Sequence, residues 1–532
     1  MTEHGSGTGG GAAVIEALRA NGVRTVFGIP GTHNLEMYRY LPGSGIEHVL
    51  CRHEQGAVYA ADGYARSGAG IAAVIATSGP GLLNAATGIA NAYADRVPVL
   101  VLAPVIERGR ERRDVGWMHE VKDQRAALDA VAAWSESAAS VEDAAALVHR
   151  AFMEWRAGET RPVVINVPHD VLVDPTPVVP SDPLPAPAPA APAAEVVQAA
   201  QRILTSAREP VVVVGGGCAR AYRELRPFLE ALGAPVVSTA RGKGVLPDGH
   251  PLSIGPVIGT DTARAAIEGA DAVLLIGTEL SEAELLDRPL QPTGSVIRVD
   301  RDLDQLHKNL RADLPVLADA GRFGTAMAEL TGWSPSDAAR IEALKAAVAA
   351  EIAGIASPFA SLHEALREAL PADAIIVGDS SQVSYMGTSL LWPSEVPDRV
   401  LCTVGFATLG YGLPAAIGAA IGNPGTAVAC VLGDGALMFS VQELATAVDL
   451  GLSLPVVVFD NGGFEEIREQ MNIRDMQHLG VDIAQPGFAE LGRALGCAST
   501  DARTGRELVE AVRQGLSAGR PTLIHVRAHD FD

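Results

Sequence analysis

The sequence predicts an α/β protein with three domains, each built on a doubly wound parallel sheet. Short apolar runs, which are typical of buried parallel strands, alternate with segments that carry apolar residues at helical spacing. The length of 532 residues is enough for three or four domains. Two connectors, at 175–194 and 332–358, divide the chain into parts of similar size.

The first domain is expected over residues 12–174. Residues 1–11 before it are polar and rich in glycine, without the apolar stretch of a signal peptide, and we expect them to form a flexible tail. Within the domain we expect helices at 12–20 and 82–94, and strands at 25–29, 72–77, 98–105 and 162–167.

Eight prolines between residues 175 and 194 exclude a helix or a central strand, so this segment is expected to be an extended linker. The central domain follows at 195–331. Its strands are expected at 211–214, 235–238, 272–276 and 295–299. Gly215-Gly216-Gly217, together with Asp300, resembles half of a dinucleotide-binding fingerprint, but the same residues fit a plain tight turn, and both interpretations stay open.

The third domain is expected over 359–532 and contains a strand–helix–strand unit. Its first strand ends at Gly433-Asp434-Gly435, and its second strand ends before Asn461-Gly462-Gly463. Parallel neighbouring strands place their carboxyl ends at one edge of the sheet, so Asp434 and Asn461 are expected to converge. Two oxygen ligands of this kind suit Mg²⁺ or Ca²⁺, and Mg²⁺ usually arrives with a phosphate group.

The first and third domains repeat one pattern. Gly79-Pro80-Gly81, a helix and the strand 98–101 correspond to Gly433-Asp434-Gly435, a helix and the strand 455–458. This likeness fits generic α/β architecture. It also fits a duplicated domain whose two copies took different halves of one cofactor site. Only the later copy carries the carboxylate, because Pro80 occupies the matching position in the earlier copy.

The composition excludes several classes of partner. The formal net charge is −22 and the pI is near 5.0, which argues against nucleic acid or an anionic membrane as a partner. No uninterrupted apolar run of about 20 residues occurs, so no membrane span is expected. The five cysteines are odd in number and form no Cys-x-x-Cys pair, as expected for small buried residues in a reducing compartment, and we expect a cytoplasmic protein.

A second carboxylate of interest is Glu54. It follows the strand-like segment 48–50 and begins a helix with small residues at Gly56, Ala57, Ala60 and Ala61. Small residues permit close packing against another helix, as at a subunit interface. A glutamate in the first turn of a helix is also favoured by the helix dipole alone, so its position fits both a structural and a catalytic role.

These motifs together resemble the thiamine diphosphate enzymes of the acetolactate synthase and 2-oxoacid decarboxylase superfamily, over essentially the whole chain. In that family a Gly-Asp-Gly is followed after about 25 residues by Asn, and 25 residues lie between Gly435 and Asn461. The other matching segments are Phe27-Gly28-Ile29-Pro30-Gly31, Arg52-His53-Glu54, Thr77-Ser78-Gly79-Pro80-Gly81 and the glycine-rich segment 410–418.

The resemblance implies pyrimidine-binding, central and diphosphate-binding domains, with thiamine diphosphate and Mg²⁺ as cofactors. It also implies a homo-oligomer, dimer or tetramer, with the cofactor between the first domain of one subunit and the third domain of its partner. Asp434, Asn461 and the Gly463 carbonyl are the implied metal ligands. The other implied cofactor contacts are Pro30, Glu54, Ser381, Gln382, Ala407, Leu409, Gly433, Gly435, Ala436 and Phe464.

The implied chemistry explains these roles. C2 of the cofactor must lose a proton to become a nucleophile. Glu54, bonded to N1′ of the pyrimidine, would favour the tautomer whose nitrogen takes that proton. Leu409 matches the apolar residue that bends the cofactor toward C2, and Ala407 stands where the family often has Gly. The activated carbon then attacks the carbonyl of a 2-oxoacid, and carbon dioxide leaves.

Three further residues are candidates for the substrate pocket. His119 and Glu120 stand where acetolactate synthases have Gln and Glu, which places them near the reacting carbonyl, and His33 follows the Pro30-Gly31-Thr32 loop. A single histidine of this kind is often a surface residue without a catalytic role, so both interpretations remain.

Glu466, on the helix expected after the metal loop, occupies a position that faces substrate in the family, where acetolactate synthases have an apolar residue. The surroundings most resemble decarboxylases of 5-guanidino-2-oxopentanoate. A carboxylate there suits a cationic side chain or a proton transfer. It also fits a solvated helix carboxylate.

The expected activity is decarboxylation of a 2-oxoacid, with or without transfer of the product to an aldehyde or ketone acceptor. The alternatives are an acetolactate synthase-like carboligase acting on pyruvate, an inactive cofactor-binding regulator, and a nicotinamide dehydrogenase based on the central glycine run. The presence of Glu54, Asp434 and Asn461 speaks against the regulator. FAD is not expected, because the central domain shows no convincing FAD signature.

Overall fold

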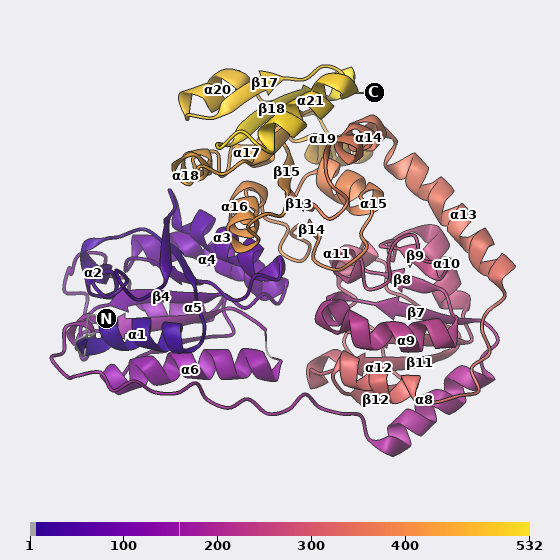
Figure 1. Cartoon of the computed structure of the whole chain (residues 1–532), viewed down its shortest axis with the longest axis horizontal. Coiled ribbons are helices and arrows are strands. Elements are labelled where there is room, and N and C mark those ends of the chain that lie inside the picture. Colours follow the sequence, from indigo (N-terminus) through magenta and orange to yellow (C-terminus); the bar gives the residue numbers. More distant parts are fainter. Residues whose placement is uncertain (1–6, 159, 532) are drawn as a thin grey trace. The chain divides into compact units, whose positions relative to one another are not determined.

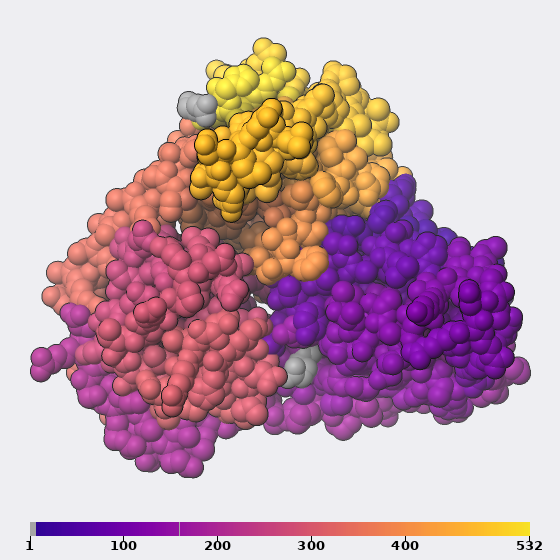
Figure 2. Space-filling model, turned by 180° about the vertical axis from the view of Figure 1, so that it is seen from behind, coloured from indigo at the N-terminus to yellow at the C-terminus, as the bar shows by residue number. Residues whose placement is uncertain are grey.

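The computed structural model contains three six-stranded sheets in which all strand pairs are parallel, with helices between the strands (Figure 1). It describes residues 7–158 and 160–531, whose surface is drawn in Figure 2. The three-domain α/β prediction is therefore confirmed at the level of the sheets. By compactness the described chain forms two units: one of residues up to 187, 406–501 and 514–525, and one of residues 188–405, 502–513 and 526 onward.

The first sheet has the order β2-β1-β3-β4-β6-β5. Its strands are β1 (Thr25–Gly28), β2 (Glu47–Leu50), β3 (Ala73–Ile75), β4 (Leu100–Val105), β5 (Trp134–Ser137) and β6 (Val163–Pro168). Its helices are α1 (Gly9–Ala20), α2 (Leu35–Tyr38), α3 (Glu54–Arg66), α4 (Pro80–Ala94), α5 (Gln124–Asp129), α6 (Val141–Ala157) and α7 (His169–Leu172).

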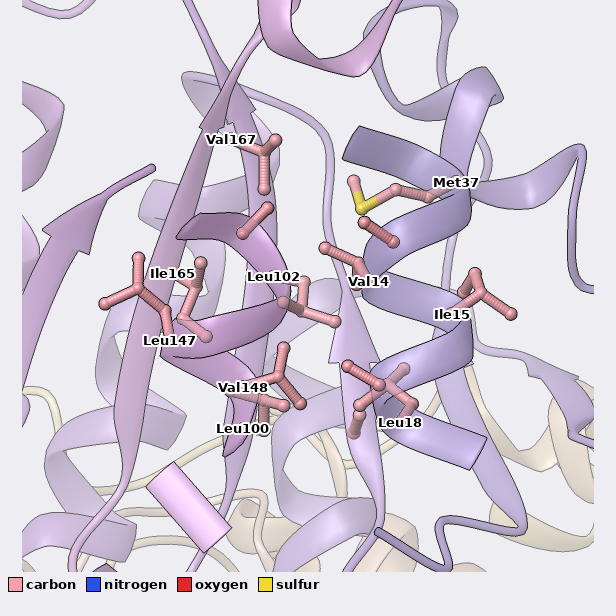
Figure 3. Close-up of a cluster of buried hydrophobic side chains, with 14 of the residues drawn as sticks. Val14, Ile15, Leu18, Met37, Leu100, Leu102, Leu147, Val148, Ile165 and Val167 are labelled. Atoms are coloured by element: carbon pink, nitrogen blue, oxygen red, sulfur yellow. The ribbon is translucent and has the colours of Figure 1, made fainter. Parts of the chain in front are cut away.

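Both faces of this sheet are covered by apolar helix surfaces. On one face, Leu18 of α1 and Val148 of α6 pack over Leu102 of β4 and Ile165 of β6 (Figure 3). On the other face, α3 and α4 pack against the same strands through small and branched side chains. Because β1, β3, β4 and β6 are buried along their whole length, they appear in the sequence as continuous apolar runs, which is why these strands were predictable.

The start of α1 differs from the prediction of a flexible tail over residues 1–11. Gly9, Gly10 and Gly11 form the first turn of α1 and are buried, while residues 1–6 lie outside the described residues. A side chain at Gly11 would overlap the backbone carbonyl of Glu36. The glycines therefore permit close packing rather than flexibility.

The central sheet has the order β12-β11-β10-β7-β8-β9. Its strands are β7 (Pro210–Val214), β8 (Val236–Ser238), β9 (Ser253–Gly255), β10 (Ala272–Ile276), β11 (Ser295–Asp300) and β12 (Leu314–Leu317). Its helices are α8 (Ala194–Ser206), α9 (Tyr222–Leu232), α10 (Asp261–Gly269), α11 (Glu282–Leu285), α12 (Ala320–Ala328) and α13 (Ala338–Ile355).

The glycine run after β7 serves internal packing. A side chain at Gly215 would overlap the carbonyl of Gly277 at the end of β10, and one at Gly217 would lie 2.9 Å from the Cα of Gly277. The N–H of Gly217 donates to the Gly277 carbonyl at 3.0 Å. The run therefore joins two strand ends, which supports the tight-turn interpretation.

The third sheet has the order β14-β13-β15-β16-β18-β17, which repeats the order of the first sheet. Its strands are β13 (Ile375–Gly378), β14 (Val400–Leu401), β15 (Val428–Gly433), β16 (Pro455–Asp460), β17 (Ala498–Asp501) and β18 (Thr522–Arg527). Its helices are α14 (Ala360–Ala369), α15 (Ser389–Leu391), α16 (Gly412–Gly422), α17 (Asp434–Leu437), α18 (Glu443–Asp449), α19 (Glu465–Ile473), α20 (Phe488–Ala494) and α21 (Gly505–Gly515).

Helix α3 packs closely on α16 within the first compact unit. A side chain at Gly63 would overlap the backbone of Ala415, and one at Gly418 would overlap the carbonyl of Ala60. The small residues predicted on α3 therefore meet a helix of the same chain, with the two backbones in direct contact.

One ion cluster is buried beside this contact. Arg66 Nη1 lies 3.3 Å from Asp95 Oδ2 and donates to the hydroxyl of Tyr411 at 3.2 Å, and that hydroxyl donates to Asp62 Oδ1 at 2.7 Å. Arg66 is almost fully buried, so loss of either carboxylate partner would leave a desolvated charge.

Among the described residues, no helix on its own has the length and apolar composition that crossing a membrane requires. The pair 338–355 and 357–369 meets that test only when combined, and it is bent by 70°.

Candidate active site

Glu54 is held in a buried position at the start of α3. His53 caps the helix, its Nδ1 accepting from the Gln55 N–H at 3.2 Å. The Nδ2 of Asn84 donates to Glu54 Oε2 at 3.1 Å. The neighbouring Gly81 has no room for a side chain, since a Cβ there would lie 2.9 Å from Glu54 Oε1. The carboxylate is therefore fixed by α3 and α4.

Glu443, which was not predicted from the sequence, binds the backbone just before the start of α3. The carboxylate of Glu443, on α18, accepts from the N–H groups of Arg52 at 3.1 Å and His53 at 2.9 Å. Thr446 Oγ1 donates to the same carboxylate at 2.6 Å. Glu443 is fully buried, and burial raises the pKa of its carboxyl while these donors oppose that rise. The partners lie 391 residues apart in the sequence, so no local pattern pointed to the contact.

Helix α3 also reaches the segment before α16. Gln55 Nε2 donates to the Tyr59 hydroxyl at 2.9 Å, and that hydroxyl lies 2.8 Å from Thr408 Oγ1. Thr408 stands between two predicted cofactor contacts, Ala407 and Leu409. Ala407 has φ of 52°, in the left-handed region where glycine is favoured, which explains why glycine is the expected residue there.

The histidines predicted for the substrate pocket lie together. The ring of His33 stacks on Trp117 with centroids 4.2 Å apart, and the ring of His119 meets it edge-on at 5.1 Å. Ser78 Oγ lies 2.7 Å from His33 Nδ1. Burial lowers the pKa of His33, and the nearby His119 and His169 lower it further, so the imidazole is neutral at pH 7.

The loop that carries His119 is strained and closely packed. His119 has φ of 66°, and its carbonyl would overlap any side chain at Gly79. Gly79 donates its N–H to Gln124 Oε1 at 3.0 Å, and Gln124 Nε2 donates to Asn166 Oδ1 at 2.9 Å. This buried network anchors the loop on the sheet. His119 Nδ1 is itself buried and has no hydrogen-bond partner among the described residues.

Glu120 does not join this cluster. Its carboxylate accepts from the N–H groups of Trp117 at 3.0 Å and Val115 at 3.3 Å. These hydrogen bonds hold together the loop of residues 115–120.

The metal loop brings Asp434 and Asn461 together, as the strand arrangement predicted. Gly433 pairs in register with Phe459 at the ends of β15 and β16. The amide oxygen of Asn461 lies 3.3 Å from Asp434 Oδ1 and 3.2 Å from the carbonyl oxygen of Gly463. With the amide turned over, its nitrogen would donate to both oxygens.

Three oxygens at this spacing fit an octahedral cation. Adjacent ligands about 2.1 Å from Mg²⁺ lie about 3 Å from each other. The set of one carboxylate, one amide and one carbonyl is also the hard oxygen chemistry that Mg²⁺ prefers. Phe464, another predicted contact, packs against Gly435, where a Cβ would lie 2.9 Å from its ring. The residues present therefore fit the implied metal.

A second carboxylate, that of Asp460, affects the charge of Asp434 at this end of the sheet. Burial, together with the nearby Asp460, raises the pKa of Asp434 to about 6. Asp460 Oδ2 lies 3.0 Å from His525 Nε2, and His525 Nδ1 lies 2.7 Å from Asp501 Oδ1. These carboxylates raise the pKa of His525, with Asp460 the larger influence, because a protonated imidazole is favoured beside the acidic strand ends.

Glu466 lies in the first turn of α19, a helix none of whose residues is buried. Gln470 Nε2 donates to Glu466 Oε1 at 3.2 Å. The neighbouring Arg468 pairs with Glu465 and with Asp482 instead.

Ser381 and Gln382, predicted as diphosphate contacts, follow β13 in the other compact unit. Ser381 Oγ lies 3.1 Å from Ser384 Oγ, at the start of the helical turn 383–388.

Comparison with known proteins identifies the class of protein. The family described as thiamine pyrophosphate enzyme matches three times: its N-terminal TPP-binding domain at residues 8–127, its central domain at 197–328 and its C-terminal TPP-binding domain at 379–526. The chain belongs to the thiamine pyrophosphate enzyme family.

Its relatives cover nearly the full length. A probable 2-ketoarginine decarboxylase of Pseudomonas aeruginosa is 38% identical over 526 residues, covering 97% of this chain and 93% of the relative. The large subunit of acetolactate synthase isozyme 2 of Escherichia coli is 30% identical over 529 residues, covering 98% and 95%. A probable acetolactate synthase large subunit of Methanocaldococcus jannaschii is 30% identical over 546 residues, covering 97% and 91%.

Proposed function

We propose that this protein decarboxylates a 2-oxoacid with thiamine diphosphate and Mg²⁺, and that the substrate carries a basic, guanidino side chain. The observation that carries the proposal is the pair of fixed acidic centres: Glu54 at the start of α3 and the three-oxygen corner of Asp434, Asn461 and Gly463. A member of the thiamine pyrophosphate family with both centres intact has the groups needed for turnover.

Each centre has a distinct task. Bound thiamine diphosphate supplies an electron-accepting ring that stabilises negative charge at the substrate carbon. Glu54 holds a proton at the pyrimidine N1′ through one carboxylate oxygen, while Asn84 fixes the other. Asp434, Asn461 and the Gly463 carbonyl would hold the metal, which would supply positive charge for the diphosphate. The backbone of Ala407 and the side chain of Leu409 orient the pyrimidine end.

The histidine cluster supplies proton transfer near the substrate carbonyl. A neutral imidazole both donates and accepts, and the lowered pKa of His33 keeps it neutral at pH 7. Ser78 and Trp117 fix its ring. We assign to His119 the donation of the proton that the substrate carbon takes up after carbon dioxide leaves. Its Nδ1 has no other partner among the described residues.

Glu466 is the proposed recognition residue for the guanidinium. The support is its place in the first turn of α19, directly after the loop of residues 461–463, and the substrate named for the Pseudomonas aeruginosa relative, 2-ketoarginine. A hydrogen bond to a charged group contributes about 1.5–3 kcal/mol. Glu466→Gln should therefore lower kcat/KM for 5-guanidino-2-oxopentanoate about 10- to 100-fold relative to a neutral 2-oxoacid of similar length.

The matched control is Glu465→Gln, one residue earlier on the same helix, because Glu465 pairs with Arg468. An unchanged preference for the guanidino substrate in Glu466→Gln would refute the assignment.

A second candidate is carboligation of pyruvate, as in an acetolactate synthase. The observation in its favour is the 30% identity with acetolactate synthases over nearly the whole chain. The deciding experiment is turnover of a 2-oxoacid panel with thiamine diphosphate and Mg²⁺, with and without aldehyde or ketone acceptors. Carbon dioxide and aldehyde from the guanidino acid support the first proposal, whereas acetolactate from pyruvate as the dominant product supports the second.

The proposal includes a homo-oligomer, dimer or tetramer, with the cofactor held between two subunits. Large apolar side chains exposed near the site support a covering partner: Phe406, Met438, Phe439, Ile467 and Ile473. Within one chain, α3 also packs against α16. A site formed by one chain and a site shared between two subunits therefore need a direct test.

Mixing two inactive variants, Glu54→Gln and Asp434→Asn, separates the arrangements. A site shared between subunits regains roughly a quarter of wild-type activity after random exchange, because half of the mixed dimer sites are intact. A site made by one chain regains none.

A further inference from the structure

The two carboxylate oxygens of Asp434 have different partners. Oδ1 faces Asn461 and thereby the three-oxygen corner described above. Oδ2 accepts a hydrogen bond from Nε2 of Gln485. Oδ1 is therefore the oxygen that faces the three-oxygen corner, whereas Oδ2 is held by Gln485.

Gln485 reaches Asp434 because a strap of chain, residues 481–485, crosses the loop of residues 461–464. The N–H of Phe464 donates to the carbonyl of Val481 at 3.0 Å, and the N–H of Ile483 donates to the carbonyl of Gly462 at 3.3 Å. Gly463 has no side chain between them, and a Cβ at this position would overlap the Val481 carbonyl. The strap is therefore fixed to the same loop that supplies two of the three oxygens.

The amide oxygen of Gln485 is a second, independent observation. Its Oε1 is buried, and among the described residues it has no hydrogen-bond partner. An orphaned buried acceptor costs about 1–3 kcal/mol, and in native proteins such atoms commonly mark the place of a water or an ion. This acceptor sits on the side chain that holds Asp434, so a donor from the metal's own coordination shell would satisfy it.

We propose that Gln485 is a positioning residue of the metal site that makes Asp434 a one-oxygen ligand and accepts, through Oε1, a hydrogen bond from a metal-bound water. This inference rests on the proposed metal site. Mg²⁺ requires near-octahedral geometry and keeps water ligands, whereas Ca²⁺ accepts two-oxygen carboxylates and higher coordination. Gln485 therefore favours Mg²⁺ over Ca²⁺.

The test is equilibrium binding rather than turnover. Mg²⁺ and Ca²⁺ are titrated by calorimetry into the full-length protein in the presence of thiamine diphosphate, for wild type and for Gln485→Met, which keeps side-chain length but removes both hydrogen-bonding groups. Loss of a residue that orients a ligand weakens metal affinity about 10- to 100-fold. We expect about 10-fold weaker Mg²⁺ binding, with Ca²⁺ affinity changed less than about threefold.

Two controls keep the result interpretable. Gln201→Met removes the amide donor to the Thr331 carbonyl in the central domain, and it should leave both affinities unchanged. Gln485→Leu repeats the test with a different apolar side chain, and the metal-free thermal midpoint of each variant confirms folding.

The outcomes separate this inference from the proposed function. Wild type that fails to bind thiamine diphosphate with Mg²⁺ would refute the function. Wild-type binding with an unchanged Mg²⁺ to Ca²⁺ preference in folded Gln485→Met and Gln485→Leu would refute only the role of Gln485. An equal loss for both metals would also refute it, because a positioning role predicts a change in preference.

Discussion

The first and third sheets have the same strand order, but the loops at matching positions carry different chemistry. After β3, Gly79 has φ of 59° and Pro80 begins α4. After β15, Gly433 is followed by Asp434, whose carboxylate meets Asn461. The same strand order therefore presents a helix start without charge in the first sheet, and in the third sheet the corner of three oxygens proposed to hold the metal.

In the proposed function, the two copies divide the work of one site. The first copy would supply Glu54 at the start of α3, and the third would supply the metal ligands Asp434, Asn461 and Gly463. The matching helices α3 and α16 pack against each other through glycines, and Glu443 of the third copy binds the backbone next to Glu54. Within one chain, the two matching sheets are therefore joined by direct contacts next to Glu54.

The largest expected effect concerns the proton chemistry of the first copy. Glu54→Gln keeps the shape of the side chain but removes the ionisable group at N1′. Carbon dioxide release should fall about 100-fold or more, because general acid–base catalysis contributes about 10²- to 10⁴-fold. The assay is steady-state decarboxylation. Activity of Glu54→Gln within threefold of wild type would contradict the proposal that the first copy supplies the proton chemistry.

The metal chemistry of the third copy gives the next effect. Asp434→Asn removes the single charged ligand of the corner and should weaken Mg²⁺-dependent cofactor binding by more than about 100-fold. Without metal the same variant should be more stable than wild type by about 1 kcal/mol, since a buried charge is lost. Binding calorimetry and urea unfolding test the two halves. Weaker stability of the metal-free variant would indicate general damage instead.

Helix α1, which precedes the first sheet, and helix α14, which precedes the third, are expected to contribute differently to the pH dependence of stability. The buried residues of α1 are apolar, whereas α14 buries His363, whose ring lies 2.8 Å from the Phe359 carbonyl and 2.9 Å from Thr388 Oγ1. Burial lowers the pKa of His363 to about 4. The unfolded chain takes up this proton near pH 6.5 and the folded chain does not, so stability is complete above pH 6.5 and falls between pH 6.5 and 4.

The expected loss from His363 is on the order of 3 kcal/mol. Urea unfolding at pH 7 and pH 4.5 measures it, and His363→Gln should show a smaller loss over this interval. Equal losses in the two proteins would exclude His363 as the source.

The contact between the copies is the next target. Gly418→Ala places a methyl group against the Ala60 carbonyl and should destabilise the protein by about 1–3 kcal/mol through overpacking. Gly354→Ala is the control, because this helix position has open space and should gain about 0.5–1 kcal/mol. If both variants change stability equally, the close α3–α16 contact is absent in solution.

The smallest effect is expected at Ala407. Ala407, in the segment before α16, has φ of 52°, in the left-handed region that favours glycine. Ala407→Gly relieves a strain of about 1–2 kcal/mol but increases the entropy of the unfolded chain, so stability should rise by less than about 1 kcal/mol. A clear loss of stability would show that the methyl group packs favourably.

The sequence was most informative where burial is continuous. The central strand β4 is buried throughout, and β16 is buried up to its last residue, and both appear as apolar runs. The edge strands β12 and β17 were not predicted, since their residues are half exposed and mixed in character.

The same limit applies to the site. The motifs identified Glu54, Asp434 and Asn461, because strand order alone brings the ends of β15 and β16 together. Glu443 and Gln485 were missed because their contacts join residues 391 and 51 positions apart. The glycines of residues 9–11 were misjudged because composition does not distinguish flexible glycine from closely packed glycine.

The central claim is that the first copy carries the proton chemistry and the third copy carries the metal. The most direct measurement is hydrogen–deuterium exchange at C2 of bound thiamine diphosphate, followed by quenching and NMR, without substrate. The account predicts fast exchange in wild type and exchange slower by about 100-fold in Glu54→Gln with the cofactor still bound. Exchange as fast in Glu54→Gln as in wild type would contradict the account.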